Sequence, residues 1–188
     1  MRRCVLALAV LLVPASSHAR PPIHGTRGPD RLLGTPAADK IIADRGDDRV
    51  DGGGGRDYLN GGPDADILNG GPDADYFEWY LKPPGVAFGR DLIEDFEKGS
   101  DRIIFEAVLR DGHVCGFDGL DTNGSGVLEP GDRHVRIVPL NVGGATRPST
   151  VIDVTPHAGV GGEQSLSIHG VVGLNARDFA CDPDLPVP

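Results

Sequence analysis

The chain has 188 residues, with 18 basic and 28 acidic side chains, and its formal net charge at pH 7 is -10. So acidic a chain repels nucleic acids and anionic lipid surfaces, and it attracts cations. Asp supplies 22 of the acidic residues and Glu only six. Short carboxylates in turns are well suited to binding a hard cation, so the composition favours metal binding over nucleic-acid binding.

Residues 1–19 have the features of a cleavable export signal. Two arginines follow the first residue, an apolar run extends from Val5 to Val13, and a small-x-small cleavage site ends at Ala19. The run is too short to span a bilayer, and no later stretch is apolar enough to do so. We therefore expect an exported protein, secreted or passing through a periplasm, whose mature net charge is -12 because two arginines are removed. A short N-terminal anchor helix is the alternative.

Cleavage of the leader leaves two cysteines, Cys115 and Cys181. In an exported protein an even number of cysteines favours a disulfide, which here would tie the end of the chain to its middle. Two unpaired buried thiols are the alternative.

Six nonapeptide units follow one another without a gap from residue 25 to residue 78. The sixth position of every unit is an aspartate: Asp30, Asp39, Asp48, Asp57, Asp66 and Asp75. The eighth position is always apolar: Leu32, Ile41, Val50, Leu59, Leu68 and Phe77. A flexible Gly/Asp-rich linker has no reason to keep both positions constant, so the repeat indicates a folded structure.

The order of residues within a unit predicts a turn followed by a very short strand. The first six positions carry glycine or small polar residues, which permit tight turns, and the last three place their middle side chain inward. Two units make one coil of eighteen residues, so units n and n+2 stack about 4.8 Å apart. The chain is therefore predicted to be mostly all-β, a parallel β-roll solenoid, whose stacked turns form all-oxygen cages of the kind that Ca²⁺ prefers.

Calcium is expected to drive the folding of this region. The small apolar core does not offset the backbone entropy lost on ordering it, and stacked carboxylates repel one another until a cation lies between them. We therefore expect the repeats to be disordered without Ca²⁺ and folded with it. Pairing each unit with the second one after it predicts about four complete sites.

The nonapeptide resembles that of the repeats-in-toxin, or haemolysin-type calcium-binding, family, whose pattern is Gly-Gly-x-Gly-x-Asp-x-apolar-x. The resemblance covers residues 25–78. The first three units begin Gly25-Thr26, Gly34-Thr35 and Ala43-Asp44 in place of the double glycine. The resemblance therefore implies that these three units are the weaker calcium binders.

Residues 79–110 are expected to cap the roll, because the last coil of a solenoid exposes an apolar edge and unpaired backbone. Within them, residues 91–105 alternate apolar and polar around a turn at residues 98–100, which predicts a hairpin-like strand pair. Additional calcium ligation by Asp91 or Asp95 is a secondary expectation.

Residues 111–132 contain a loop that resembles the calcium loop of an EF-hand, in its dockerin-like variety, after a short entering helix. Counted from Asp121, Gly126 occupies the sixth position, where the loop must turn sharply. The predicted oxygen ligands are Asp121, Asn123, Ser125, the Val127 carbonyl, Glu129 and Asp132. Because Ser125 replaces a charged ligand and Asp132 replaces a longer Glu, we expect a weak site, about 10⁻⁴ M or looser. A turn without an ion is the alternative.

Residues 133–182 are predicted to form a small β-rich region. The candidate strands are His134–Leu140, Thr150–Val154 and Leu166–Val172, separated by glycine-rich turns. Asn175 is the expected N-cap of a one-turn helix. The last part of this region is similar to the C-terminal ends of many repeats-in-toxin proteins.

The sequence contains neither a His-Glu-x-x-His helix nor a Gly-x-Ser-x-Gly elbow. His134 and His169 lie in strand-like runs and are expected to be structural. We therefore predict a secreted, non-catalytic calcium-binding module that presents a rigid surface to an unidentified protein or cell-surface partner and has no membrane span. A small secreted hydrolase, or a remnant of one, stabilised by the roll is the alternative.

Overall fold

The computed structural model describes residues 20–81, 89–109, 112–115, 120–132, 134–153 and 164–180. The predicted leader and Cys181, with the disulfide predicted for it, lie outside the described residues. Within the described part, the elements are strands β1 to β14 and one 3₁₀ helix, η1 (Ala176–Asp178). That helix is far too short to cross a bilayer, and no candidate membrane span occurs among the described residues.

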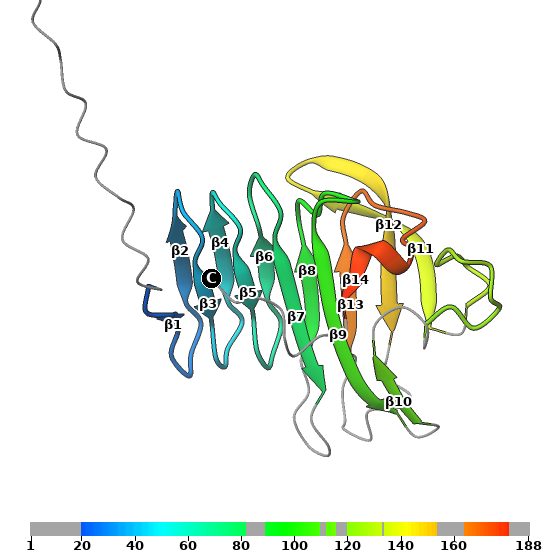
Figure 1. Ribbon diagram of the computed structural model, residues 1–188, viewed down its shortest axis with the longest axis horizontal. Helices are drawn as coiled ribbons and strands as arrows, with labels where there is room; N and C mark the ends of the chain where they lie inside the picture. The colour runs from blue at the N-terminus through cyan, green and yellow to red at the C-terminus, as the bar shows by residue number, and fades with distance from the viewer. Residues whose placement is uncertain are drawn as a thin grey trace, which may run out of the picture.

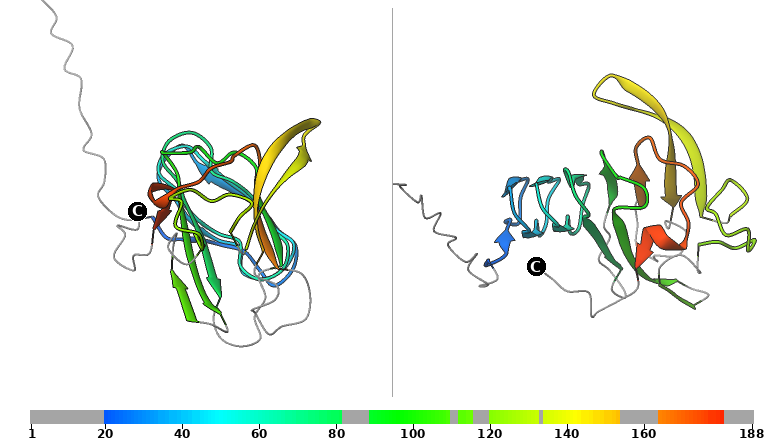
Figure 2. Two further views of the ribbon diagram at one scale, coloured as in Figure 1. Left: turned by 90° about the vertical axis from the view of Figure 1, so that its right-hand side faces the viewer. Right: turned by 45° about the horizontal axis from the view of Figure 1, so that its top comes forward.

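The N-terminal half winds into a roll of two parallel sheets, and its coils are stacked in chain order (Figures 1 and 2). Successive strands alternate between the sheets, and each pairs in parallel with the strand two places further along. The strands are β1 (Ile23–His24), β2 (Arg31–Thr35), β3 (Lys40–Ile42), β4 (Arg49–Gly53), β5 (Tyr58–Asn60), β6 (Ile67–Asn69), β7 (Tyr76–Leu81), β8 (Arg90–Ile93) and β9 (Arg102–Leu109). The predicted parallel β-roll, with units n and n+2 stacked, is confirmed.

The apolar eighth positions form the core of the roll. In one sheet Ile41 lies opposite Leu59, and Leu59 lies opposite Phe77. In the other sheet Val50 lies opposite Leu68. The fully buried side chains of this core are Ile41, Val50, Leu59, Leu68, Phe77, Ile93 and Ile103, each 0% exposed. Inward placement of this position, with its neighbours facing outward, follows from the two-residue period of a strand.

The roll is longer than the six repeats. Strand β1 precedes them, and Ile23 lies nine residues before Leu32, at the spacing of the repeat. At the other end, the hairpin-like strand pair predicted for residues 91–105 is wrong. Strand β8 pairs in parallel with β6, whereas β9 pairs in parallel with β7 in the opposite sheet. Residues 90–109 continue the alternation of the roll because Ile93 and Ile103 each enter the core between the two sheets.

The C-terminal region extends both sheets beyond the last coil. Its elements are β10 (Gly112–Cys115), β11 (Val135–Val142), β12 (Ala145–Asp153), β13 (Ser165–Ile168), η1 and β14 (Phe179–Ala180). Strand β13 pairs in parallel with β8, and β14 pairs in parallel with β9. The edges that the last coil would otherwise expose are therefore covered by strands.

Strands β11 and β12 form a long antiparallel hairpin that projects from the body of the molecule (Figure 2). The glycine pair at residues 143–144 makes its turn, with φ angles of 57° and 86°. Compared with the prediction, β12 begins earlier, at Ala145, and β13 ends earlier, at Ile168. Gly170 lies beyond β13 at a φ of 72°, which turns the chain out of the strand.

Aromatic side chains pack within the last coils of the roll, and a buried polar contact joins these coils to the C-terminal region. The Phe77 ring stacks near Trp79, with centroids 6.5 Å apart, and lies 6.0 Å from the Phe96 ring. Asn175 caps η1 as predicted, in a capping box with Asp178. The other carboxylate oxygen of Asp178 accepts a 3.0 Å hydrogen bond from the Gly99 amide, which ties the C-terminal segment to the turn between β8 and β9.

Truncation of a core side chain tests this packing. Leu68→Ala is expected to lower the free energy of unfolding of the calcium-saturated protein by about 2–5 kcal/mol, because a fully buried leucine leaves a cavity. Leu33 lies on the edge strand β2 and is 58% exposed, so Leu33→Ala should change it by less than about 0.5 kcal/mol. Urea unfolding at saturating Ca²⁺ measures both. Equal losses in the two variants would contradict the register.

Candidate metal centre

The repeat turns stack in two rows, one along each edge of the roll. We call residues 25–30, 43–48 and 61–66 the first row, and residues 34–39, 52–57 and 70–75 the second row. Backbone hydrogen bonds join successive turns within a row. The Arg45 amide donates to the Thr26 carbonyl at 3.2 Å, and the Gly54 amide donates to the Thr35 carbonyl at 2.9 Å.

The sixth-position aspartates form a ladder along each row. The backbone N–H of each one donates to the Oδ1 atom of the aspartate one coil further on. The first row runs Asp30 to Asp48 (2.7 Å), Asp48 to Asp66 (2.9 Å) and Asp66 to Asp91 (2.9 Å). The second row runs Asp39 to Asp57 (2.8 Å), Asp57 to Asp75 (2.8 Å) and Asp75 to Asp101 (3.0 Å). One carboxylate oxygen of each ladder member beyond the first is thus satisfied by the backbone.

The second oxygen of four of these carboxylates has no hydrogen-bond partner among the described residues. The four orphaned Oδ2 atoms belong to Asp48, Asp57, Asp66 and Asp75, which are between 0% and 3% exposed. A buried carboxylate oxygen without a hydrogen bond is strongly destabilising unless a counter-charge is bound to it. The four orphaned oxygens therefore fit a bound cation.

Glycine at the first position of a unit makes room for the carboxylate. A Cβ atom built on Gly52, Gly61 or Gly70 would lie 2.3–2.5 Å from the Oδ2 atom of the aspartate five residues later. No real Cβ tolerates so close a contact. At these three positions a hydrogen in place of a Cβ therefore leaves room for the carboxylate, whereas the third unit has Ala43 at the same position before Asp48.

Burial raises the pKa of these aspartates above the usual value. Removal of the carboxylate from water is the largest cause for Asp57, Asp66 and Asp75, whose pKa is raised to about 7. The backbone hydrogen bonds of the ladder oppose the rise, and neighbouring aspartates add to it. The pKa of Asp48 is raised for the same principal reason. A cation bound among these groups would favour their ionised forms.

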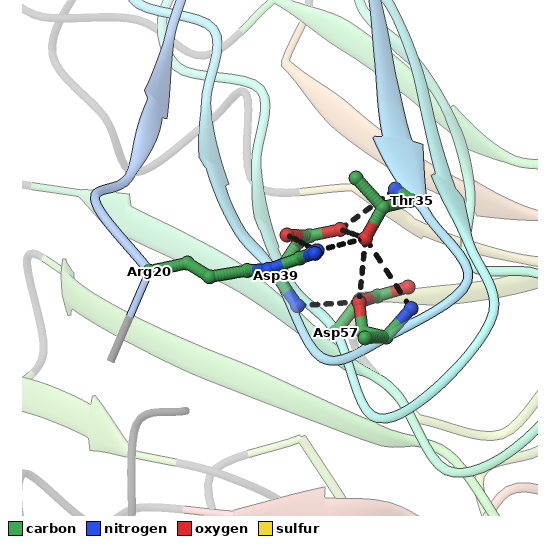
Figure 3. A network of polar contacts seen from close by, with 5 residues as sticks. Arg20, Thr35, Asp39 and Asp57 are labelled. Carbon is green, nitrogen blue, oxygen red and sulfur yellow. Dashed lines mark hydrogen bonds and ion pairs between the residues drawn. The ribbon is translucent and has the colours of Figure 1, made fainter. Parts of the chain in front are cut away.

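The first aspartate of each row has a different environment. Asp30 Oδ2 accepts hydrogen bonds from the Thr26 amide (2.6 Å) and hydroxyl (2.9 Å). Asp39 Oδ2 accepts the equivalent bonds from Thr35, both at 2.7 Å. The Arg20 guanidinium contacts the Thr35 hydroxyl and lies 3.4 Å from Asp39 Oδ1 (Figure 3). Protein donors thus occupy the oxygen that is orphaned in the four following turns.

Protein donors also close both rows at the C-terminal end. Asp91 is 1% exposed, and its Oδ2 accepts a 2.5 Å hydrogen bond from the Trp79 indole. Asp101 Oδ2 accepts from the Glu97 amide at 2.7 Å. The two carboxylate oxygens of Asp95 accept from the amides at residues 70 and 71. Burial raises the pKa of Asp91 and Asp95, and it raises that of Asp101 to about 6.

A family model described as the RTX calcium-binding nonapeptide repeat, in four copies, matches residues 24–59 and 46–77. The chain carries RTX calcium-binding repeats. Its repeats are therefore of a kind that binds Ca²⁺ as a structural ion, and the ladder with its orphaned oxygens agrees with this assignment. The predicted recognition of the repeat is confirmed.

Two solved structures are similar over nearly the whole chain. The R3 subunit of the mannuronan C5-epimerase AlgE6 from Azotobacter vinelandii is 26% identical, with a TM-score of 0.58, and the match covers 90% of each chain. The R2 subunit of the same enzyme is 27% identical, with a TM-score of 0.54, over 89% of this chain and 96% of that one. No curated protein sequence matches. The structural similarity thus extends past the RTX repeats into the C-terminal region.

The RTX ladder extends to two aspartates that were missed or underrated from the sequence. Asp91 was expected only as an additional ligand, and Asp101 was not expected in any role. Both open an Asp-x-apolar triplet, Asp91-Leu92-Ile93 and Asp101-Arg102-Ile103, like the end of a repeat. Their ladder bonds span 25 and 26 residues, whereas those within the repeats span 18. A search for the triplet without a fixed period would have found them.

The predicted loop ligands lie together in residues 121–132. Asp121 Oδ1 accepts from the amides of residues 124 and 125, and its Oδ2 accepts from the Gly126 amide at 2.8 Å. Asn123 Oδ1 accepts from the Ser125 amide, while the Ser125 hydroxyl donates to the Val127 carbonyl at 2.9 Å. Glu129 Oε1 accepts from the Asn123 side chain at 3.3 Å. The loop is turned around Asp121, and its calcium ligation stays a prediction.

Asp132, at the predicted twelfth position, is 5% exposed and bonded to the backbone of the loop. Its Oδ1 accepts from the Thr122 amide at 2.8 Å, and its Oδ2 accepts from the Glu129 amide at 3.0 Å. Among the described residues, no group of three or more His, Cys, Asp or Glu side chains is arranged to hold a metal. A cation in the loop or in the RTX turns therefore requires backbone carbonyl oxygens beside the carboxylates, which is ordinary for Ca²⁺.

The raised pKa values predict opposite pH dependence with and without calcium. Between about pH 4 and pH 7 the calcium-free fold retains protons on Asp57, Asp66 and Asp75 that the unfolded chain has released. The free energy of unfolding of the calcium-free fold should therefore fall as pH rises through this window. Calcium needs the ionised carboxylates, so the stabilisation it adds should rise over the same window.

Far-UV circular dichroism of metal-stripped protein at pH 5 and pH 8, with and without CaCl₂, measures this effect. We expect more strand signal at pH 5 than at pH 8 without calcium, and a larger calcium-induced gain at pH 8. Asp66→Asn should weaken the dependence because an amide does not titrate. A calcium-free protein with more strand at pH 8 than at pH 5 would contradict the burial of these carboxylates.

Proposed function

We propose that this chain is an exported, non-catalytic module whose RTX roll folds when it binds Ca²⁺ and then presents a rigid surface to a partner. One observation carries the proposal: four buried carboxylate oxygens have no partner within the described protein. An ion at each would supply the positive charge that the fold lacks. The absence of the two hydrolase motifs from the sequence supports a non-catalytic role.

Three sets of residues in the roll contribute to calcium-driven folding in different ways. The ladder amides hold one oxygen of each aspartate, which leaves the other available to an ion. The first-position glycines keep space for the carboxylate. The buried eighth-position side chains bring the two sheets together. Without the ion, the closely stacked carboxylates repel one another and oppose all three effects.

Export would explain why folding that depends on calcium is useful to this protein. The predicted leader of residues 1–19 supports passage out of the cytoplasm, where free Ca²⁺ is scarce, into a medium where it is abundant. A chain that stays unfolded until it meets calcium folds only after export. The strongly acidic composition keeps the unfolded chain soluble and extended.

Calcium titration of the mature protein tests the proposed function. Far-UV circular dichroism should show a reversible change from coil to strand between micromolar and millimolar CaCl₂, undone by EGTA. MgCl₂ at the same concentrations is the control, because Mg²⁺ gives up its water reluctantly and demands a stricter geometry. A metal-free protein that already has the full strand signal would refute calcium-driven folding.

We also propose that the loop of residues 121–132 binds a further, weaker Ca²⁺. Its support is that Asp121, Asn123 and Glu129 lie in one loop turned at Gly126, where φ is 82°. Asp121→Ala should remove one ion per molecule at millimolar free Ca²⁺ and leave the dichroism of the roll unchanged. Ser125→Asp restores a charged fifth ligand and should tighten this ion. An unchanged ion count in Asp121→Ala would show that the loop is a turn without metal.

A second candidate function is the binding of an acidic polysaccharide. Two subunits of a mannuronan C5-epimerase are similar to this chain over most of its length. An open hollow of about 600 Å³ at the start of the first row is lined by the exposed side chains of Arg27 and Arg45, together with Gly25, Thr26 and Asp44. Two arginines one coil apart provide paired donors for carboxylates spaced along a polymer.

Affinity electrophoresis in gels that contain polymannuronate, with a neutral glucan as the control polymer, tests this candidate. The wild type should be retarded by polymannuronate alone, and Arg27→Ala combined with Arg45→Ala should abolish the retardation. Arg147→Ala, on the exposed part of β12, is the matched control and should not alter it. Equal mobility of the wild type in both gels would remove this candidate and leave calcium-driven folding untouched.

A further inference from the structure

The six RTX turns have two backbone conformations, although every one of them contains the sixth-position aspartate. In the last four turns the second and fourth positions both have positive φ, between 72° and 116°. These pairs are Asp44 and Gly46, Gly53 and Gly55, Gly62 and Asp64, and Gly71 and Asp73. In the first two turns the same positions are Thr26 and Gly28, and Thr35 and Ala37, and none of these has positive φ. The difference separates the first turn of each row from those that follow.

The threonine hydroxyl closes each of these first turns from within. Thr26 Oγ1 lies 3.3 Å from both the amide nitrogen and the carbonyl oxygen of Gly28. Thr35 has the same two contacts, at the same distances, with Ala37. Each hydroxyl is also within hydrogen-bond distance of Oδ2 of its own aspartate, and the threonine amide donates to the same oxygen. Two independent turns thus repeat one set of contacts.

The aspartate is held differently as a result. A Cβ atom on Gly34 would lie 3.3 Å from Asp39 Oδ2, whereas the equivalent distance at Gly52 is 2.5 Å. Asp39 is nevertheless 4% exposed, so its carboxylate is as deeply buried as those of the following turns. Its charge is met by Arg20, whose Nη1 atom lies 3.4 Å from Asp39 Oδ1 (Figure 3). Two hydrogen bonds to Oδ2 and a guanidinium beside Oδ1 therefore give the Asp39 carboxylate the polar partners and the positive charge that a bound ion would give it.

The position of these turns explains why a protein donor is useful there. Among the described residues the first turn of each row has a ladder aspartate on one side only, whereas Asp66 and Asp75 are followed by Asp91 and Asp101, so the first turn offers an ion fewer oxygens than the later turns. Ca²⁺ requires six to eight oxygen ligands, and an ion at the end of a row would exchange readily with water. A hydroxyl and an amide from the same turn need no second turn.

We infer that Thr26 and Thr35 exclude calcium from the first turn of each row, so that the ions of the roll lie at the four later turns. The ion-binding turns are those with the orphaned oxygens of Asp48, Asp57, Asp66 and Asp75. Asp30 and Asp39 are then structural acceptors and not ligands. The inference rests on the proposed binding of calcium by the RTX repeats. It adds that a threonine at the second position of a unit marks a turn that takes no ion.

Four single Asp→Asn variants of the mature protein test the inference. Asn keeps one oxygen acceptor, for the ladder amide at Asp48 and Asp57 and for the threonine donors at Asp30 and Asp39, while it removes the charge that Ca²⁺ needs. Asp30→Asn and Asp39→Asn should bind as many ions as the wild type, measured by equilibrium dialysis with ⁴⁵Ca²⁺ at millimolar free calcium. Asp48→Asn and Asp57→Asn, one coil further along the same rows, should each bind one ion fewer. The loop at residues 121–132 is unchanged in all four variants, so any ion that it binds adds equally to every ion count.

Far-UV circular dichroism at saturating Ca²⁺ shows whether each variant is folded. If Asp48→Asn or Asp57→Asn fails to fold, Asp30→Asn and Asp39→Asn still decide the matter. A full ion count in both folded variants supports the inference. Loss of one ion from either overturns it and leaves calcium-driven folding intact. A wild type that binds no calcium would overturn the proposed function together with the inference.

Discussion

The rest of this structure depends on the burial of carboxylates at a spacing where they repel one another. Each interior repeat aspartate, such as Asp57, has one oxygen held by the backbone of the preceding coil and one without a hydrogen-bond partner among the described residues. A neutral roll of the same shape would need no ion, and a roll with exposed aspartates would feel little repulsion, because water screens it. Because these carboxylate oxygens are buried without a hydrogen-bond partner, a bound cation would contribute directly to the stability of the fold.

The nine-residue period satisfies two requirements at once. The eighth position fills the core between the sheets, and the sixth position places a carboxylate in the turn, two residues before the inward side chain. Because consecutive strands belong to opposite sheets, the carboxylates fall into two rows at opposite edges. Any change in the length of a unit would move both sets together. After Phe77 the period is abandoned, yet Ile93 and Ile103 still enter the core, and Asp91 and Asp101 still extend the rows.

The strictly periodic part of this arrangement was predictable from the sequence. The parallel pairing, the inward eighth position and the row of aspartates all follow from a repeat that holds in register over six units. The hairpin predicted for residues 91–105 was wrong because alternation and a turn indicate two strands but do not say which partners they take. The parallel partners of β8 and β9 are supplied by β6 and β7, which are distant in sequence. Asp91 accepts a hydrogen bond from the Trp79 indole, and Asp101 accepts one from the Glu97 amide. Neither donor lies in a repeat.

The two ends of the roll differ in how their sheet edges and apolar core are covered. At the C-terminal end, β13 and β14 continue both sheets, and the core remains fully buried at Ile93 and Ile103. At the N-terminal end no strand precedes β1 and β2 within the described residues, and Ile23 and Leu32 are only partly buried. The hydroxyls there satisfy polar atoms, but they bury no apolar surface, which is the larger source of stability. The first coil therefore depends for its order on the coil beneath it, and that coil contains the first of the orphaned oxygens, at Asp48.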